Sequence, residues 1–508
     1  MKSIKVKNLR SIIDSGDIEL SSINILLGRN SSGKSSFLRL FPLLKETSRH
    51  ELRGPILWFD ENYDFGDFSN TLSRHAEGDK DMITMEFTLD VSKRPNHSSY
   101  FYSYERPLKK EETITVEIGI SKHNGNAFFK RIRIKIWEHD MLFETESPTK
   151  SVQLTLDGRI VTQNECMWDY GSRGILPSLK YPSSHNPLEI IVETLKEIYQ
   201  SDIIKDAGLY FLWRQPLLDD YSAWNFIKEN YLKQKSVKLT KKVRESENFR
   251  KLIDSAIWLN LQRLFRYVDD ELSEYFTHTY YVTPLRYNYQ RYMRNRDLAV
   301  EYVESSGKNV MEYILSLNEK ERTSYIGYIR NLGIEVDVTG QENKGIYVTM
   351  DDGERDNIVD VGYGYSQVLP IATILWDRAY KQDRYSSNTI VIEQPEVHLH
   401  PAMQKKLARL FVEALHLAQK RGRKLTLIVE THSSSLVNRL GRYVLNNNIT
   451  TDSEVMKYYQ MDDERDVKIG NDDISIYLFE KTEGVTHITR TGYDKSGRIE
   501  RWPIGFMD

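Results

Sequence analysis

The chain has 508 residues, of which 40% are hydrophobic and 28% charged, a composition typical of a globular protein with several domains. Lys and Arg total 70 against 73 Asp and Glu, so nucleic-acid binding would require a local basic patch. The single cysteine, Cys166, excludes an intrachain disulfide and suits a reducing compartment. We expect a cytoplasmic protein outside the membrane, because no signal peptide is recognisable and no apolar run approaches the roughly 20 residues that span a bilayer.

The first predicted elements are two strands, a glycine-rich loop and a helix. Residues 3–12 and 23–28 are rich in β-branched side chains and predict strands. The second strand leads directly into residues 28–36, GRNSSGKSS, which have the spacing of a phosphate-binding loop. Apolar residues at helical spacing follow, and we expect that helix to break at Pro42. A strand before the loop and a helix after it disfavour a chance match.

The middle of the chain predicts an antiparallel β region followed by a mainly helical one. Short alternating runs between residues 82 and 137 are separated by polar turns, which predicts an antiparallel meander. The pattern over residues 187–333 is mostly helical, with one long amphipathic candidate at 248–276. Two further runs, GIEVDVTG and GIYVTMDDG, predict a hairpin.

The later part of the chain predicts an α/β pattern. Helical patterns at 365–380 and 402–422 alternate with apolar strands at 388–393 and 424–430, which predicts a parallel sheet. Neither this block nor the P-loop segment is large enough alone for a nucleotide-binding sheet. We therefore predict one α/β P-loop ATPase domain, split by a large antiparallel-β and helical insertion.

This organisation predicts five parts along the chain. The two halves of the ATPase domain flank a β part and a helical part, and a β-rich domain follows with the strand patterns SIYLFEK and VTHITRT. The predicted ranges are 1–80 for the first ATPase half, 81–160 for the antiparallel β part, 161–335 for the Tyr- and Lys-rich helical insertion, 336–445 for the second ATPase half and 446–508 for the β-rich domain.

The P-loop residues have individual predicted roles. Its two glycines allow a tight backbone path, so that N–H groups of residues 30–35 can point at a phosphate. Lys34 would reach the β- and γ-phosphates, and the hydroxyl of Ser35 would bind Mg²⁺. The predicted ATP-binding residues of this loop are Gly28, Asn30, Ser31, Ser32, Gly33, Lys34, Ser35 and Ser36.

Acidic and histidine side chains follow the two buried strands of the α/β block. Glu393 ends the first strand, where we expect a carboxylate that supports Mg²⁺ across from Ser35. His432 comes just after the second strand and can contact the γ-phosphate or orient a water. The alternatives are an ordinary acid at a strand end and a structural histidine. The presence of a P-loop upstream favours the catalytic interpretation.

A second glycine-rich turn precedes the helix at 365–380. Gly364, Ser366 and Gln367 lie in this turn, DVGYGYSQ, and can bind phosphate at a helix N-terminus. One chain cannot easily bring two such termini onto the same γ-phosphate, whereas a second copy of the chain could. The turn therefore predicts a site that two subunits share.

Together and in this order, these motifs resemble those of ABC-type ATPases of the RecF, SMC and OLD group. The resemblance implies a Walker A motif at 28–36, a signature motif at GYGYSQ, a Walker B motif at IVIEQPE and a switch histidine at His432. It further implies ATP and Mg²⁺ as cofactors. It also implies a dimer in which Ser366 of one subunit meets the nucleotide held by Lys34 of the other.

A closer resemblance is to stand-alone bacterial AAA ATPases that contain EQPE.HLHP, ETHS and a terminal WP.GFF motif. The matching segments here are 393–401, 430–433 and WPIGFMD, and the segment at 280–293 resembles the PLR segment of these proteins. Several anti-phage systems, Septu among them, use ATPases of this kind beside a separate nuclease. The resemblance therefore implies a partner effector, and too few residues follow His432 for an OLD-type nuclease domain.

One departure from the ABC-type pattern concerns hydrolysis. Those ATPases usually end Walker B with Asp-Glu, the Glu being the base for water, whereas this chain has Glu393 and Gln394. A glutamine cannot accept a proton at neutral pH, although it can orient a water. Glu396 is the nearest spare carboxylate. We therefore expect slow hydrolysis, with catalytic roles for these residues and His432.

Two segments are candidates for nucleic-acid contact. Lys233–Lys251 holds eight Lys and Arg against two Glu, and residues 280–296 interleave Tyr with Arg. Basic side chains can neutralise phosphates and tyrosines can stack on bases. The alternatives are a solvated helix face for the first segment and a Tyr-rich core for the second.

These observations predict an ATP-binding, slowly hydrolysing ABC-type ATPase that forms a homodimer or higher homo-oligomer around ATP. We expect it to act as a sensor or regulator in an anti-phage complex with an effector nuclease. Two alternatives stay open: a RecF-like DNA-repair clamp, and a nucleotide-gated scaffold that does not hydrolyse ATP.

Overall fold

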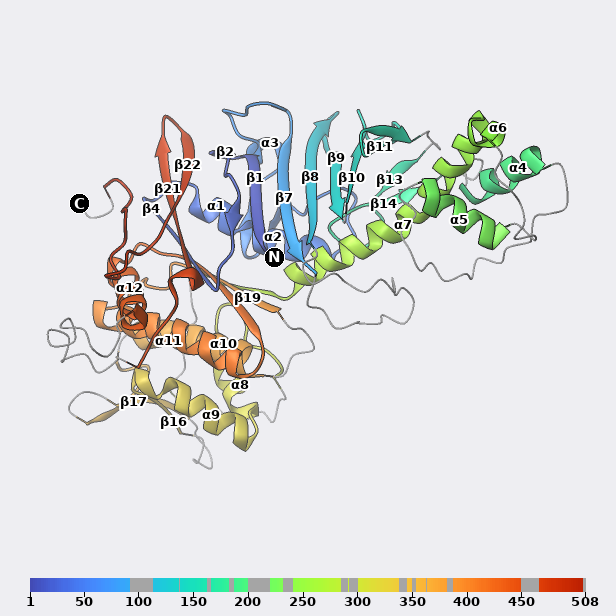
Figure 1. Ribbon diagram of the computed structural model, residues 1–508. Helices are drawn as coiled ribbons and strands as arrows, with labels where there is room; N and C mark the ends of the chain where they lie inside the picture. Colours follow the sequence, from blue (N-terminus) through green and yellow to red (C-terminus); the bar gives the residue numbers. More distant parts are fainter. Residues whose placement is uncertain are drawn as a thin grey trace. The chain divides into compact units, whose positions relative to one another are not determined.

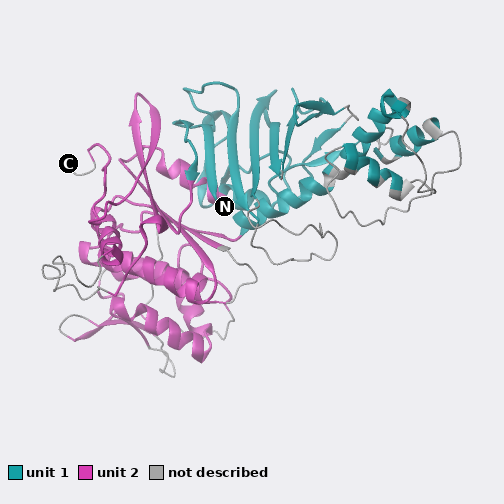
Figure 2. Ribbon diagram, in the orientation of Figure 1, with its two compact units in different colours: residues 1–18, 43–277 teal, residues 19–42, 278–508 magenta. Residues whose placement is uncertain are grey.

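The chain divides into two compact units, one made of residues 1–18 and 43–277 and the other of residues 19–42 and 278–508 (Figure 2). The predicted division into five parts stays a prediction. The computed structural model describes residues 1–91, 113–136, 138–161, 166–181, 187–199, 220–231, 241–284, 291, 300–337, 345–349, 353–361, 363–381, 387–448 and 466–505.

The first unit contains an antiparallel sheet (Figure 1). The predicted meander is confirmed, because neighbouring strands β7, β8 and β9 pair antiparallel. In spatial order the strands are β12 (Arg159–Val161), β11 (Gln153–Leu156), β10 (His139–Glu144), β9 (Asn126–Ile136), β8 (Thr113–His123), β7 (Ile83–Asp90), β1 (Ser3–Leu9) and β2 (Ile12–Asp14).

A long helix, α7 (Glu247–Thr277), covers this sheet, and its position confirms the helix predicted at 248–276 (Figure 1). Phe265 of α7 meets Phe143 edge to face with ring centroids 4.7 Å apart, a favoured arrangement of buried aromatic rings. Smaller elements complete the unit: β5 (Phe59–Asp60), β6 (Tyr63–Asp64), α3 (Phe68–Thr71), β13 (Met167–Asp169), β14 (Ser178–Lys180), α4 (Pro187–Tyr199), α5 (Asp220–Tyr231) and α6 (Lys241–Arg244).

The second unit contains the parallel sheet that the α/β pattern predicts. Its buried strands read as continuous apolar runs, as expected where both faces are covered. In spatial order they are β15 (Thr279–Val282), β19 (Ser387–Glu393), β20 (Lys424–Glu430), β4 (Ile23–Gly28) and β21 (Ile474–Thr482), with β22 (Val485–Thr491) antiparallel to β21. Strand β20 thus lies between the P-loop strand and β19.

Helices flank these strands, and the structure confirms the α/β fold class. The predicted hairpin near residue 340 is confirmed as the antiparallel pair β16–β17. The remaining elements of the unit are α1 (Lys34–Leu38), α8 (Val310–Ser316), α9 (Glu319–Ile329), β16 (Ile334–Asp337), β17 (Gly345–Thr349), β18 (Arg355–Asn357), α10 (Tyr363–Tyr380), α11 (Pro401–Lys420), α12 (Ser434–Asn448) and two 3₁₀ turns, Arg330–Leu332 and Asn471–Asp473. Across the described ranges, no helix combines the length and apolarity needed to cross a membrane.

The predicted helix break at Pro42 is wrong. The interruption comes at Arg39, which ends α1, and Pro42 lies in the first turn of α2 (Leu40–Arg49). The first turn of a helix tolerates proline, because its N–H groups have no intrahelical acceptor. The chain passes between the two units three times: within the short strand β3 (Ile18–Glu19), within α2, and between Thr277 and His278 at the end of α7.

A carboxylate of α7 orders a glycine turn in the first unit. Oδ1 of Asp269 accepts the N–H groups of Ile175 and Leu176 at 2.7 and 2.8 Å. The preceding residue, Gly174, has φ +140°, and a Cβ built there would lie 1.9 Å from Oδ2 of Asp269. A side chain at this position must therefore displace the buried carboxylate.

We expect Gly174→Ala to destabilise the protein by about 2 kcal/mol, because it combines backbone strain with a clash against Asp269. Urea denaturation followed by circular dichroism measures the change. Gly171→Ala is the matched control, because the nearest atom to its added Cβ is a side-chain oxygen at 3.5 Å, an ordinary contact. Equal stability of the two variants would contradict this interpretation.

Candidate functional site

The P-loop connects β4 to α1 and brings its lysine back over the loop. Nζ of Lys34 donates hydrogen bonds to the carbonyl oxygens of Gly28 and Arg29, both at 2.8 Å. Gly28 has φ +156°, and a Cβ there would lie 2.3 Å from the carbonyl oxygen of Phe479 on β21. Gly33 has φ +100°, so both predicted glycines occupy backbone positions that disfavour a side chain.

The P-loop serine meets a carboxylate that the sequence did not single out. Oγ of Ser35 donates to Oε1 of Glu430 at 2.9 Å, and Nζ of Lys34 lies 3.9 Å from the same oxygen. The side chains of Lys34 and Glu430 are 2% and 1% exposed, so this is a buried ion pair. Glu430 directly follows the apolar run of β20, as Glu393 follows that of β19. Its position at the end of a buried strand is the sequence signal that could have identified it.

Glu393, which was predicted to lie across from Ser35, bonds Arg39 and Tyr281, whereas the hydroxyl of Ser35 bonds the neighbouring strand-end acid Glu430. Oε1 of Glu393 accepts a hydrogen bond from Nη2 of Arg39 at 2.8 Å and its Oε2 accepts one from Nε at 3.3 Å. The hydroxyl of Tyr281 on β15 also donates to this carboxylate. The reason is strand order: β20 lies between β4 and β19, so the P-loop serine meets the end of β20 first. The metal role of Glu393 stays a prediction.

Burial shifts the pKa values of this cluster. The pKa of Glu430 is raised to about 7, mainly because burial penalises its charge, while Lys34 and the hydrogen bonds of Ser35 and Gln394 oppose the shift. Burial likewise lowers the pKa of Lys34, against the attraction of Glu430. The pKa of His432 is lowered to about 4 by burial and by Lys34, so its imidazole is neutral at neutral pH.

The loops after β19 and β20 are joined to each other. The N–H of Gln394, which has φ +45°, donates to the carbonyl oxygen of Glu430 at 2.9 Å. Oε1 of Glu396 accepts the N–H of His432 at 2.6 Å, and its Oε2 accepts the hydroxyl of Thr431 at 2.8 Å. The predicted catalytic residues therefore gather at the carboxyl ends of the parallel strands, the usual place for ligands in this architecture.

The other predicted residues occupy separate positions. Asn30 and Ser31 are exposed on the P-loop, whereas Ser32 is buried. Ser366 and Gln367 are buried near the start of α10, where Gly364 approaches the loop after β19. Their contact with the nucleotide of a second subunit stays a prediction, as does a role for Ser36.

The two segments considered for nucleic acid are only partly described. Residues 285–290 and 292–296 of the Tyr/Arg segment, and residues 233–240 of the basic segment, lie outside the described residues. Tyr280 and Tyr281 belong to β15, where their hydroxyls donate to Val303 and Glu393. For these two tyrosines the structure therefore supports a role in packing rather than in nucleic-acid contact.

Oxygen ligands for a magnesium nucleotide are present at the P-loop. Mg²⁺ in such sites takes one or two protein oxygens and completes its shell with phosphate oxygens and waters. The adjacent oxygens of Ser35 and Glu430 fit this requirement. Within the described residues, no group of three or more His, Cys, Asp or Glu side chains is arranged to hold a metal by itself.

Comparison with known proteins identifies the family. Solved structures similar to this chain include the SMC head bound to the C-winged helix domain of ScpA, at 11% identity and TM-score 0.34 over 97% of this chain and 98% of that one. The SMC head domain from Thermotoga maritima is similar at 11% identity and TM-score 0.34, over 96% and 97%. Scores this low carry no argument about the site, and no curated protein matches. Residues 1–437 match the model of the AAA ATPase domain, so the chain belongs to that family.

Proposed function

We propose that this protein is an ABC-type ATPase that binds MgATP at residues 28–36, hydrolyses it slowly and dimerises around it. The observation that carries the proposal is the buried cluster of Lys34, Ser35 and Glu430 at the end of the parallel sheet. Membership of the AAA ATPase family supports nucleotide use in general. The cluster adds a specific set of groups for phosphate and Mg²⁺.

Lys34 is the group that would change partners on binding. Its ammonium now bonds two carbonyl oxygens of its own loop, and it can exchange them for oxygens of the β- and γ-phosphates. Ser35 would hold Mg²⁺, which neutralises developing phosphate charge and leaves Glu430 able to act on water.

Glu430 is also the carboxylate best placed to replace the missing base. Gln394 cannot accept a proton, and Glu393 is engaged by Arg39 and Tyr281. Glu430 stands beside the lysine that would hold the γ-phosphate. In this scheme Gln394 orients the attacking water. The oxygen of that water bonds to the γ-phosphorus while its proton passes to Glu430, and the bond between the γ-phosphorus and the leaving ADP oxygen breaks.

The biological setting rests on the sequence resemblance. The segments EQPEVHLHP, ETHS and WPIGF support a sensor or regulator of an anti-phage complex with a separate nuclease. A DNA-repair clamp is the alternative, and in the described part of the basic segment two of the cations have acidic neighbours. There Lys241 and Arg250 lie beside Glu245 and Asp220, which offset their charge.

We expect Lys34→Ala to reduce phosphate release by a factor on the order of 100, because a cation that stabilises the transferring phosphate is lost. A coupled assay of phosphate release with purified protein measures it. Lys424→Ala, an exposed lysine at the start of β20, is the control. Unchanged turnover in Lys34→Ala would exclude the P-loop as the hydrolytic site.

The two strand-end glutamates are expected to differ in effect. Glu430→Gln should slow phosphate release about 100-fold while MgATP binding persists, because an amide cannot accept the proton. Glu393→Gln should chiefly lower the melting temperature, since it leaves Arg39 without its charged partner. Paired measurements of turnover and thermal unfolding test this. If Glu393→Gln slowed phosphate release and Glu430→Gln only lowered the melting temperature, the catalytic role would belong to Glu393.

Dimerisation is expected to depend on bound nucleotide. In Glu430→Gln, MgATP should double the molar mass measured by light scattering, because slow turnover keeps the shared sites occupied. The same experiment with Lys34→Ala should show no ATP-dependent increase. A mass that does not respond to ATP in either variant would contradict a nucleotide-locked dimer.

A further inference from the structure

Two residues give the P-loop a backbone path that other elements must hold in place. Ser31 has φ +62° and Gly33 has φ +100°. A serine side chain disfavours this left-handed region, so the conformation persists only where neighbouring groups fix it. The shape of the loop therefore depends on its contacts with the rest of the second unit.

Strand β22 supplies one such contact. Oγ1 of Thr486 donates a hydrogen bond to the carbonyl oxygen of Ser32 at 2.9 Å, and both residues are 2% exposed. In a trans peptide group the C=O and N–H bonds point in opposite directions. By holding the C=O of Ser32 on the β22 side, Thr486 directs the N–H of Gly33 away from β22. This N–H is one of the groups of residues 30–35 that would face a phosphate.

Strand β21 contacts the two ends of the same loop. Gly28 pairs with Phe479 in the parallel register of β4 and β21, and a Cβ on Gly28 would lie 2.3 Å from the carbonyl oxygen of Phe479. The ring of Phe479 also lies against that of Phe37 on α1, with ring centroids 6.1 Å apart. The hairpin β21–β22 therefore contacts the P-loop at its first residue, at its middle and at the helix that follows it.

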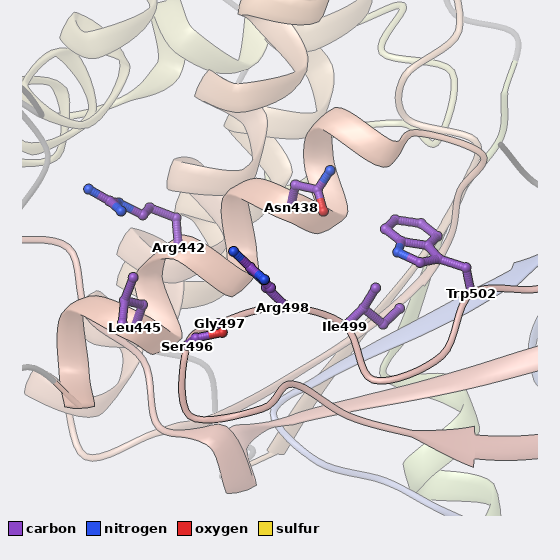
Figure 3. Close-up of a pocket in the computed structure, with 8 residues that line it drawn as sticks. All are labelled: Asn438, Arg442, Leu445, Ser496, Gly497, Arg498, Ile499 and Trp502. Carbon is purple, nitrogen blue, oxygen red and sulfur yellow. The ribbon is translucent and has the colours of Figure 1, made fainter. Parts of the chain in front are cut away.

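The hairpin is fixed in turn, because the segment that follows β22 is seated on α12. The hydroxyl of buried Tyr493 donates to the carbonyl oxygen of Val437 at 2.6 Å, and a Cβ on Gly441 would lie 2.1 Å from the carbonyl oxygen of Gly497. Figure 3 shows this segment running along the helix, and a cavity of about 370 Å³ lies between the two. The hairpin and this segment lie beyond residue 437, where the match to the AAA ATPase domain ends.

We propose that Thr486 is a positioning residue for nucleotide binding, which holds the carbonyl of Ser32 so that the N–H of Gly33 faces a phosphate of ATP. The inference rests on the proposed function, since it concerns the same P-loop. The hydroxyl of Thr486 acts through the peptide group between residues 32 and 33 and does not touch the nucleotide. Because that N–H would bind phosphate before and during the reaction, its loss of orientation should raise KM more than it lowers kcat.

The first test compares two short side chains at position 486. Thr486→Ser keeps the hydroxyl, whereas Thr486→Ala removes the donor to the carbonyl oxygen of Ser32. We expect Thr486→Ala to raise the Kd of the non-hydrolysable analogue AMP-PNP with Mg²⁺ about tenfold, the effect of one buried hydrogen bond. Thr486→Ser should stay within about threefold of the unchanged protein, because its donor is retained. Isothermal titration calorimetry measures both.

Steady-state phosphate release gives a second readout that a general structural defect would not reproduce. In Thr486→Ala the KM for ATP should rise about tenfold while kcat changes by less than about twofold, and Thr486→Ser should restore KM. Thr486→Val keeps the branched shape and serves if the alanine variant does not fold. Thr489→Val is its matched control, because it makes the same change at an exposed position of β22 and should leave the Kd unchanged.

Loss of affinity without the hydroxyl, with recovery in Thr486→Ser, supports the positioning role. Equal affinity of the serine and alanine variants, or a fall in kcat at unchanged KM, would overturn it while ATP binding stands. Failure of both hydroxyl-free variants to fold would assign the hydroxyl to stability and would also overturn it. If the unchanged protein does not bind AMP-PNP, the proposed function itself fails, and this inference fails with it.

Discussion

Two buried carboxylates at adjacent strand ends set the main constraint on the second unit. Glu393 and Glu430 are direct neighbours in the parallel register of β19 and β20. Buried charges of like sign raise each other's proton affinity and are tolerated only when each has a partner. The short helix α1 and its end supply both cations, Lys34 for Glu430 and Arg39 for Glu393. The P-loop helix and the two strand ends therefore hold each other in place.

This pairing gives the two acids different partners. Lys34 and Ser35 connect Glu430 to the phosphate-binding loop, whereas Arg39 and Tyr281 tie Glu393 to the side of the sheet near β15. Gln394 adds no third charge to the pair, and its N–H instead bonds the backbone of Glu430. Gln394 and Glu430 thus belong to one arrangement. The amide Gln394 follows β19, and the neighbouring strand β20 ends in the acid Glu430.

Much of the fold was predictable because local patterns and long-range packing agree. Continuous apolar runs predicted the buried parallel strands, alternation predicted the meander, and amphipathic spacing predicted α7 and α11. Pro42 misled the prediction because proline is compatible with a first turn, and the pattern did not show where that turn begins. The sequence did not single out Glu430 because it does not show that β20 lies between the P-loop strand and β19.

The sequence by itself determined the phosphate-binding loop, the strand-end acid Glu393 and the α/β class, since each depends on residue types at short spacing. Only the tertiary structure decided which acid bonds Ser35 and that Arg39 and Tyr281 engage the other. These contacts join residues more than 100 positions apart. Which residues meet depends on the order and register of the strands. Burial and pairing across the whole sheet select that order and register, and no local sequence pattern encodes them.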